Sequence, residues 1–146
     1  MLLPDVNILV YAHRADEDFH EPYRAWLEQL ASGRAPFALS VLVAAAFVRI
    51  VTHRRIYPDP SPLPVALGAL EALAGRRNCR LVGPGPDHWR EFTALCREVG
   101  ARGKLVADAQ HAAVTIEHGC TLVTRDGDFA RFERAGLRWQ HLVLEH

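Results

Sequence analysis

Short apolar runs alternate with longer amphipathic segments along the 146-residue chain. The runs that read as strands lie at residues 1–3, 36–39, 80–82, 120–124 and 137–142. Residues 6–12 are also apolar, but this segment is too short for its periodicity to separate a strand from a helix. Short apolar strands that alternate with helices are typical of a parallel sheet covered on both faces. The pattern predicts an α/β fold with a short, mainly parallel central sheet, in a single domain over residues 1–146.

Helices are expected where apolar residues recur at a spacing of three and four positions. They are predicted over residues 21–31, 41–52, 67–74, 87–99 and 105–118. Ser40 and Asp87 are placed to act as N-caps, and Gly119 to end the last helix. Residues 16–18 are interpreted as a solvated acidic turn, and Lys104 as a loop residue.

Composition and charge exclude several classes of protein. Seventeen Lys and Arg residues balance 17 Asp and Glu residues, which argues against a tail-like nucleic-acid binder with an overall basic excess. Three cysteines without close spacing provide neither a disulfide framework nor a metal knuckle, so we expect reduced thiols in a cytoplasmic protein. No apolar stretch is long enough to span a membrane, and no signal peptide is apparent. The eight histidines are expected to be packed or solvated, because their spacing does not favour chelation of one ion.

Three aspartates are the candidates for chemistry. Asp5 and Asp126 each follow an apolar strand, and the carboxyl ends of parallel strands line the crevice where ligands bind. Asp108 lies near the start of a helix, at the border of its apolar face, and could point to the same edge. Such gathered carboxylates suit Mg²⁺ or Mn²⁺. Taken singly, each has a structural alternative: Asp5 as a helix cap, Asp126 as an Asx turn and Asp108 as a partner of the helix dipole.

At these residues the sequence resembles the PIN-domain family, and within it the VapC-like ribonuclease toxins. The matching stretches are PDVNILVYA at the start, VADAQHAA around Asp108 and TRDGDF around Asp126. The resemblance implies a three-layer α/β/α sandwich and an endoribonuclease dependent on Mg²⁺ or Mn²⁺. It also implies a homodimer and a cognate antitoxin. Asp5, Asp108 and Asp126 would hold the cation, Asp128 could join them, and Asn7 would support the site through hydrogen bonds.

One feature departs from the family pattern. The family normally places a Glu in the helix after the second strand, where this chain has Ala46 or, in an alternative register, Val41. No acid occurs between Glu28 and Asp59. Asp128 or another acid folded nearby could complete the site, the metal could bind through fewer carboxylates, or the chain could have attenuated activity.

The same acid-free stretch carries a basic cluster, Arg49, Arg54 and Arg55, which we expect beside the crevice and in contact with an RNA backbone. For Arg54 and Arg55 a solvated helix end is an equally good interpretation. The leading hypothesis is therefore a metal-dependent endoribonuclease. The first alternative is a catalytically silent module that binds antitoxin or RNA. The second is a phosphoaspartate protein, which the position of Asn7 disfavours.

Overall fold

The computed structural model describes residues 1–145. Its strands are β1 (Leu2–Pro4), β2 (Phe37–Ser40), β3 (Cys79–Val82), β4 (Thr121–Thr124) and β5 (Trp139–His141). Its α-helices are α1 (Val6–His13), α2 (His20–Ser32), α3 (Val41–Val51), α4 (Leu63–Ala74), α5 (His88–Val99) and α6 (Lys104–Glu117). A 3₁₀ segment, η1 (Gly127–Ala135), lies between β4 and β5.

The sheet is parallel and has the strand order β3-β2-β1-β4-β5. From the central strand β1 the chain builds outward through β2 and β3, and then crosses to add β4 and β5 on the other side. The topological switch point therefore lies between β1 and β4, where crevices form at the carboxyl ends of the strands.

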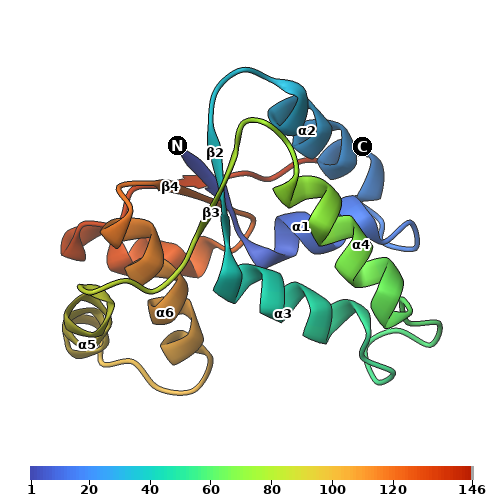
Figure 1. The fold of residues 1–146 in the computed structure, drawn as a ribbon. Coiled ribbons are helices and arrows are strands. Elements are labelled where there is room, and N and C mark those ends of the chain that lie inside the picture. The colour runs from blue at the N-terminus through green and yellow to red at the C-terminus, as the bar shows by residue number, and fades with distance from the viewer. Residues whose placement is uncertain (146) are drawn as a thin grey trace.

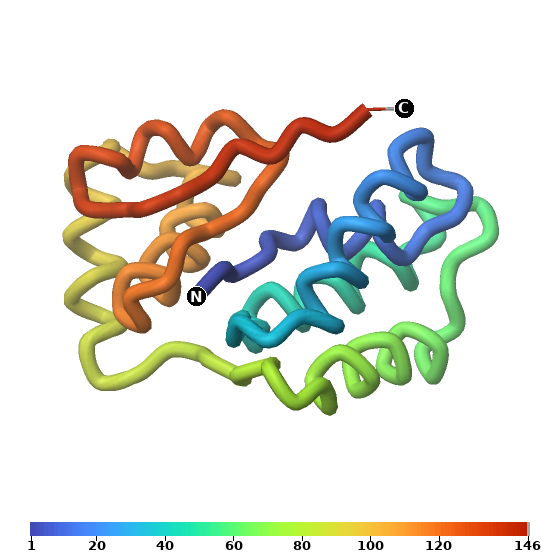
Figure 2. Tube along the Cα trace, turned by 90° about the horizontal axis from the view of Figure 1, so that it is seen from above, coloured from blue at the N-terminus to red at the C-terminus, as the bar shows by residue number. Residues whose placement is uncertain are grey.

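Helices cover both faces of the sheet and complete three layers. Figures 1 and 2 show α1 to α4 on one side of the strands and α5, α6 and η1 on the other. Leu3 of β1 and Leu122 of β4 are fully buried, as are Val43 of α3 and Ala112 of α6. This burial explains why the central strands β1, β2 and β4 are mostly apolar. The predicted α/β/α sandwich is confirmed.

Most predicted elements are present; the structure resolves one open assignment and corrects several others. The ambiguous segment 6–12 is a helix, α1, whose N-cap is Asp5. Lys104 is not a loop residue but the first residue of α6. Asp87 makes no capping bond through its side chain, which instead pairs with Arg90 at 3.3 Å. Beyond Asp126 the expected turn continues as the 3₁₀ segment η1, and the last strand is shorter than predicted. Ser40, by contrast, caps α3 as expected, accepting a hydrogen bond from the amide of Leu42.

None of the helices within residues 1–145 has both the length and the apolar character needed to cross a membrane. Over the same residues all three cysteines, Cys79, Cys96 and Cys120, are unpaired, in agreement with the expectation of reduced thiols.

Candidate functional site

A cleft of about 340 Å³ opens at the switch point of the sheet. Asp5 directly follows β1, and Asp126 follows β4 by two residues. Asp108 lies one turn into α6, which packs against the end of the sheet. The structure thus brings together the three aspartates that the sequence predicted, and all three line this cleft.

Asp5 is held by both of its carboxylate oxygens. Oδ1 accepts a 2.8 Å hydrogen bond from the amide of Val6, at the start of α1, and Oδ2 accepts a 2.7 Å bond from the hydroxyl of Thr124. The side chain is buried, and burial raises the pKa of its carboxyl group although these hydrogen bonds and the nearby His111 oppose the rise. The helix-cap alternative and the site interpretation are therefore compatible, because one oxygen caps α1 while the carboxylate still borders the cleft.

Thr124 and Asn7 tie the ends of β1 and β4 together. Oγ1 of the fully buried Thr124 accepts hydrogen bonds from Nδ2 of Asn7 at 3.3 Å and from the amide of Asp126 at 3.0 Å. Oδ1 of Asn7 accepts a 3.2 Å bond from the amide of Arg125. Asn7 therefore positions the carboxylates indirectly. It binds the Thr124 side chain, which contacts Asp5, and the backbone amide of Arg125, which lies next to Asp126 in the chain.

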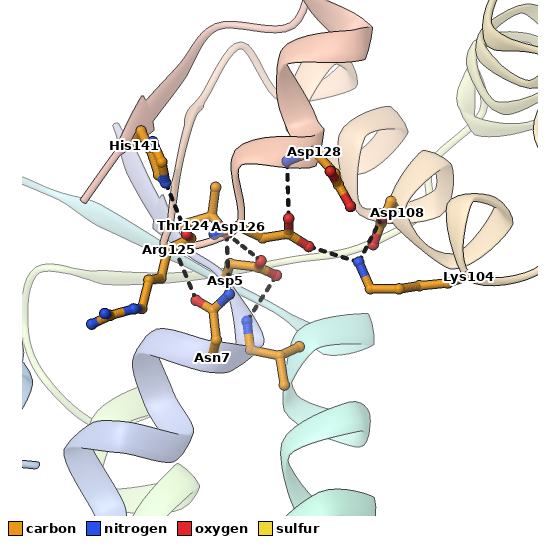
Figure 3. A network of polar contacts seen from close by, with 10 residues as sticks. Asp5, Asn7, Lys104, Asp108, Thr124, Arg125, Asp126, Asp128 and His141 are labelled. Carbon is orange, nitrogen blue, oxygen red and sulfur yellow. Dashed lines mark hydrogen bonds and ion pairs between the residues drawn. The ribbon is translucent and has the colours of Figure 1, made fainter. Parts of the chain in front are cut away.

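Lys104 lies between the other two aspartates. Its Nζ atom donates to Oδ2 of Asp126 at 2.6 Å and to Oδ2 of Asp108 at 3.2 Å, as Figure 3 shows. The second oxygen of Asp126, Oδ1, accepts a 2.9 Å bond from the amide of Asp128 and starts η1, which is the expected Asx-type turn. The two carboxylates therefore already share one cation, supplied by the protein itself.

The pKa values of the two aspartates move in opposite directions although they share the same ammonium group. For Asp108, whose side chain is only 10 % exposed, burial dominates and raises the pKa despite the bond from Lys104. For Asp126, which is 25 % exposed, burial is outweighed by the bonds from Lys104 and the Asp128 amide, so its pKa is lowered. The two bonds likewise outweigh burial at Lys104 and raise its pKa. At neutral pH the pair Lys104–Asp126 is ionised.

The donors in the cleft fit a divalent cation in their chemistry. They are carboxylate oxygens, the ligands that Mg²⁺ and Mn²⁺ prefer, and Asp108 and Asp126 already converge on one positive charge. As arranged in residues 1–145, however, no three His, Cys, Asp or Glu side chains form a group that could hold a metal ion. A cation held by all three aspartates therefore requires their side chains to move closer together.

The remaining candidates separate into those at the cleft and those outside it. Arg49 lines the cleft, whereas Arg54 and Arg55 are exposed in the turn after α3 and are absent from its lining. Asp128 lines a neighbouring pocket together with Lys104 and Asp108. It is thus close to the site, but it is absent from the lining of the cleft that contains Asp5.

The structure discriminates between the two positions at which the family's Glu was sought. Ala46 lines the cleft. Val41 is not part of that lining and lies against Gly83, where a Cβ atom would come within 2.6 Å of the valine side chain.

A fourth carboxylate does enter the cleft, from Glu17, whose Oε1 accepts a 2.7 Å bond from the hydroxyl of Tyr57. The interpretation of residues 16–18 as a solvated turn is therefore wrong for Glu17.

Four residues at the site were missed or undervalued in the sequence. Lys104 precedes Asp108 by four residues, a helical spacing that could have revealed the pair once α6 was extended by one residue. Thr124 is the first residue of the TRDGDF motif and could have been identified from that motif. His111 lines the cleft, where its buried Nδ1 has no hydrogen-bond partner in the part of the chain described. Glu17 lies in a loop and carries no signal in the sequence.

Comparisons with known proteins agree with this geometry. The PIN domain model matches residues 2–135. Ribonuclease VapC43 of Mycobacterium tuberculosis is 43% identical over 141 residues, which cover 97% of this chain and 95% of the relative. Among solved structures, VapBC2 of Rickettsia felis, bound to a DNA fragment from its promoter, gives a TM-score of 0.67 at 21% identity, covering 95% of this chain and 96% of that one.

A second solved structure, the sarcin-ricin loop cleaving toxin VapC20 of Mycobacterium tuberculosis, gives a TM-score of 0.66 at 18% identity. It covers 99% of this chain and 100% of that one. At these identities the two solved structures bear on the fold alone.

Proposed function

The chain belongs to the PIN domain family and, within it, to the VapC ribonucleases, and we propose that it is a divalent-metal-dependent endoribonuclease acting as the toxin of a toxin–antitoxin pair. The observation that carries the proposal is the convergence of Asp5, Asp108 and Asp126 on one cleft at the switch point of the sheet. Three carboxylates that line one cleft are the kind of ligand set that a metal-dependent phosphodiester-cleaving site needs.

Each residue has a role that follows from its contacts. Asp5, Asp108 and Asp126 would hold Mg²⁺ or Mn²⁺, and a cation bound there polarises a phosphoryl oxygen and activates water. Thr124 and Asn7 keep the ends of β1 and β4 in register, so that Asp5 and Asp126 face each other across the cleft. Arg49, at the wall of the same cleft, would bind the RNA backbone.

The positions of the acidic side chains favour Glu17 over Asp128 as the fourth carboxylate of the site. Glu17 shares the cleft with Asp5, whereas Asp128 lines the adjoining pocket. The Tyr57 hydroxyl fixes Glu17 at the cleft, and the guanidinium of Arg14 lies 4.1 Å from the centre of the Tyr57 ring. In this proposal a loop carboxylate compensates in part for Ala46, and activity is retained at a reduced level.

The test is cleavage of structured RNA in Mg²⁺ or Mn²⁺, compared with chelator. The variants Asp5→Asn and Asp126→Asn should lose about two or more orders of magnitude in rate, while Asp87→Asn, which changes an exposed aspartate outside the cleft lining, should not. Equal activity of the Asp5→Asn variant and the unmodified protein would refute the proposal that the protein is a nuclease.

The alternative, a catalytically silent module, is favoured by one observation: the cleft lining includes Ala46, a position at which the resemblance to the family implies a Glu. It predicts RNA binding without cleavage in any divalent metal. In either case we propose a cognate antitoxin as partner, since the fold is similar to that in a toxin–antitoxin complex from Klebsiella pneumoniae. A homodimer and a cytoplasmic location, the latter suggested by three unpaired cysteines, remain predictions.

A further inference from the structure

The position of Lys104 is not explained by the stability of its own helix. Lys104 is the first residue of α6, at the positive end of the helix dipole, where a cation is unfavourable. The pair with Asp108 also runs in the less favourable direction, with the cation N-terminal to the anion. The N-cap residue is Gly103, which has no side chain that could cap the helix. The contacts that compensate the ammonium group are the two carboxylates of the cleft.

Lys104 is also free to leave those contacts. Its side chain is 67 % exposed, and a four-carbon stem lets the ammonium move by several ångströms without a change in the backbone. It is the only lysine of the chain, against 16 arginines. Asp126, in contrast, stays fixed through Oδ1 when its Oδ2 loses the lysine.

We propose that the Lys104 ammonium occupies the place between Asp108 and Asp126 that a divalent cation would take, so that the metal must displace Lys104 in order to bind. The inference rests on the proposed function for the identity of the metal-binding carboxylates. The Lys104 ammonium already binds one oxygen of each carboxylate, and the like charges of the ammonium and a metal ion would exclude both from the same few ångströms. Lys104 thereby neutralises the metal-free site and lowers its affinity for the metal.

The test is calorimetric titration of the full chain with MnCl₂ alone, in about 0.15 M salt to screen distant charges. The Lys104→Met variant should bind Mn²⁺ about tenfold or more tightly than the unmodified chain. Lys104→Arg keeps the charge and should stay within about threefold of it. Arg97→Met is the matched control: it removes one positive charge from an exposed residue of α5 that lines neither the cleft nor the adjoining pocket, and it should change affinity by less than about threefold.

A second readout is the thermal stability of the same proteins. Without metal, Lys104→Met should melt at a lower temperature, because Asp108 and Asp126 lose their counter-charge, and Mn²⁺ should raise its melting temperature more than it does for the unmodified chain. If this variant were to fold poorly, Lys104→Gln removes the charge while keeping a hydrogen-bond donor.

Two results separate this inference from the proposed function. Unchanged or weaker Mn²⁺ binding by both Lys104→Met and Lys104→Gln overturns the inference, even where the unmodified protein cleaves RNA. Tighter Mn²⁺ binding by these variants supports it, even where none of the proteins cleaves RNA and the nuclease is thereby refuted.

Discussion

The hydroxyl of Thr124 donates a 2.7 Å hydrogen bond to Oδ2 of Asp5, joining residues 119 positions apart at the switch point of the sheet. The same oxygen of Thr124 accepts bonds from Asn7 and from the amide of Asp126. One buried hydroxyl therefore aligns the two strand ends that carry two of the three aspartates. Its replacement should affect stability and site geometry together.

Thr124→Val keeps the shape of the side chain but removes all three hydrogen bonds. The expected loss is about 1–3 kcal/mol in the free energy of unfolding, because polar groups of Asp5, Asn7 and Asp126 lose their partner in a buried place. Urea unfolding measures the loss. Thr121→Val, at the half-buried start of the same strand, is the control and should cost less than about 0.5 kcal/mol. Equal losses for the two variants would contradict the role given to Thr124.

A Glu introduced into α3 should strengthen metal binding at one of the two candidate positions only. Ala46→Glu places a carboxylate in the lining of the cleft and should tighten Mn²⁺ binding by about tenfold, since it adds a hard oxygen ligand and a negative charge. Val41→Glu introduces the same charge on the same helix but outside that lining, so its effect should be small. Calorimetry with MnCl₂ compares the two variants. Equal gains would show that the added charge acts at long range rather than as a ligand.

The agreement between sequence and structure is best where local pattern and topology coincide. Apolar strands, the Ser40 cap and the aspartates after β1 and β4 were all predictable, because parallel strands must end at one edge. The secondary structure of segment 6–12 was ambiguous because the segment is short and most of its residues are apolar. What made it a helix is its cap, Asp5, together with packing against α2 and α3.

The contacts across the site were beyond the reach of sequence patterns. Lys104 meets Asp126 over 22 positions, and Glu17 meets Tyr57 over 40. Both contacts depend on where the loops end and on which rotamers the long side chains adopt. The periodicity of neighbouring residues does not encode these features. The roles of the three aspartates, of Asp128 and of the arginines stay predictions.

Arg49 should contribute to RNA binding more than Arg54 or Arg55. Arg49 lines the cleft, whereas the other two are exposed beyond the end of α3. In chelator, where cleavage is prevented, Arg49→Ala should weaken binding of single-stranded RNA and reduce the salt dependence of log K by about 0.7–1, the value of one phosphate contact. Fluorescence anisotropy over a range of salt concentrations measures both effects. The Arg54→Ala and Arg55→Ala variants serve as controls, and a larger effect from either would place the RNA path outside the cleft.

Stability should fall on mild acidification because of His13. Nε2 of His13 lies 3.0 Å from Oγ of Ser61, and its ring packs edge-on against Phe47. Burial, helped by the charge of Arg14, lowers the pKa of the imidazole below its ordinary value of 6.5. The unfolded chain therefore binds a proton at His13 before the folded chain does. The stability associated with neutral His13 is fully present above pH 6.5 and is lost as the pH falls through the lower pKa of the folded state.

The variant His13→Gln has no group to protonate at this position and should lose less stability than the unmodified chain between about pH 7.5 and about pH 5.5. Urea unfolding at the two pH values gives the comparison, and the quantity that matters is the change with pH rather than the stability at either value. If His13→Gln lost as much stability on acidification as the unmodified chain, the acid sensitivity would have to come from other groups, and the buried, neutral state assigned to His13 would be wrong.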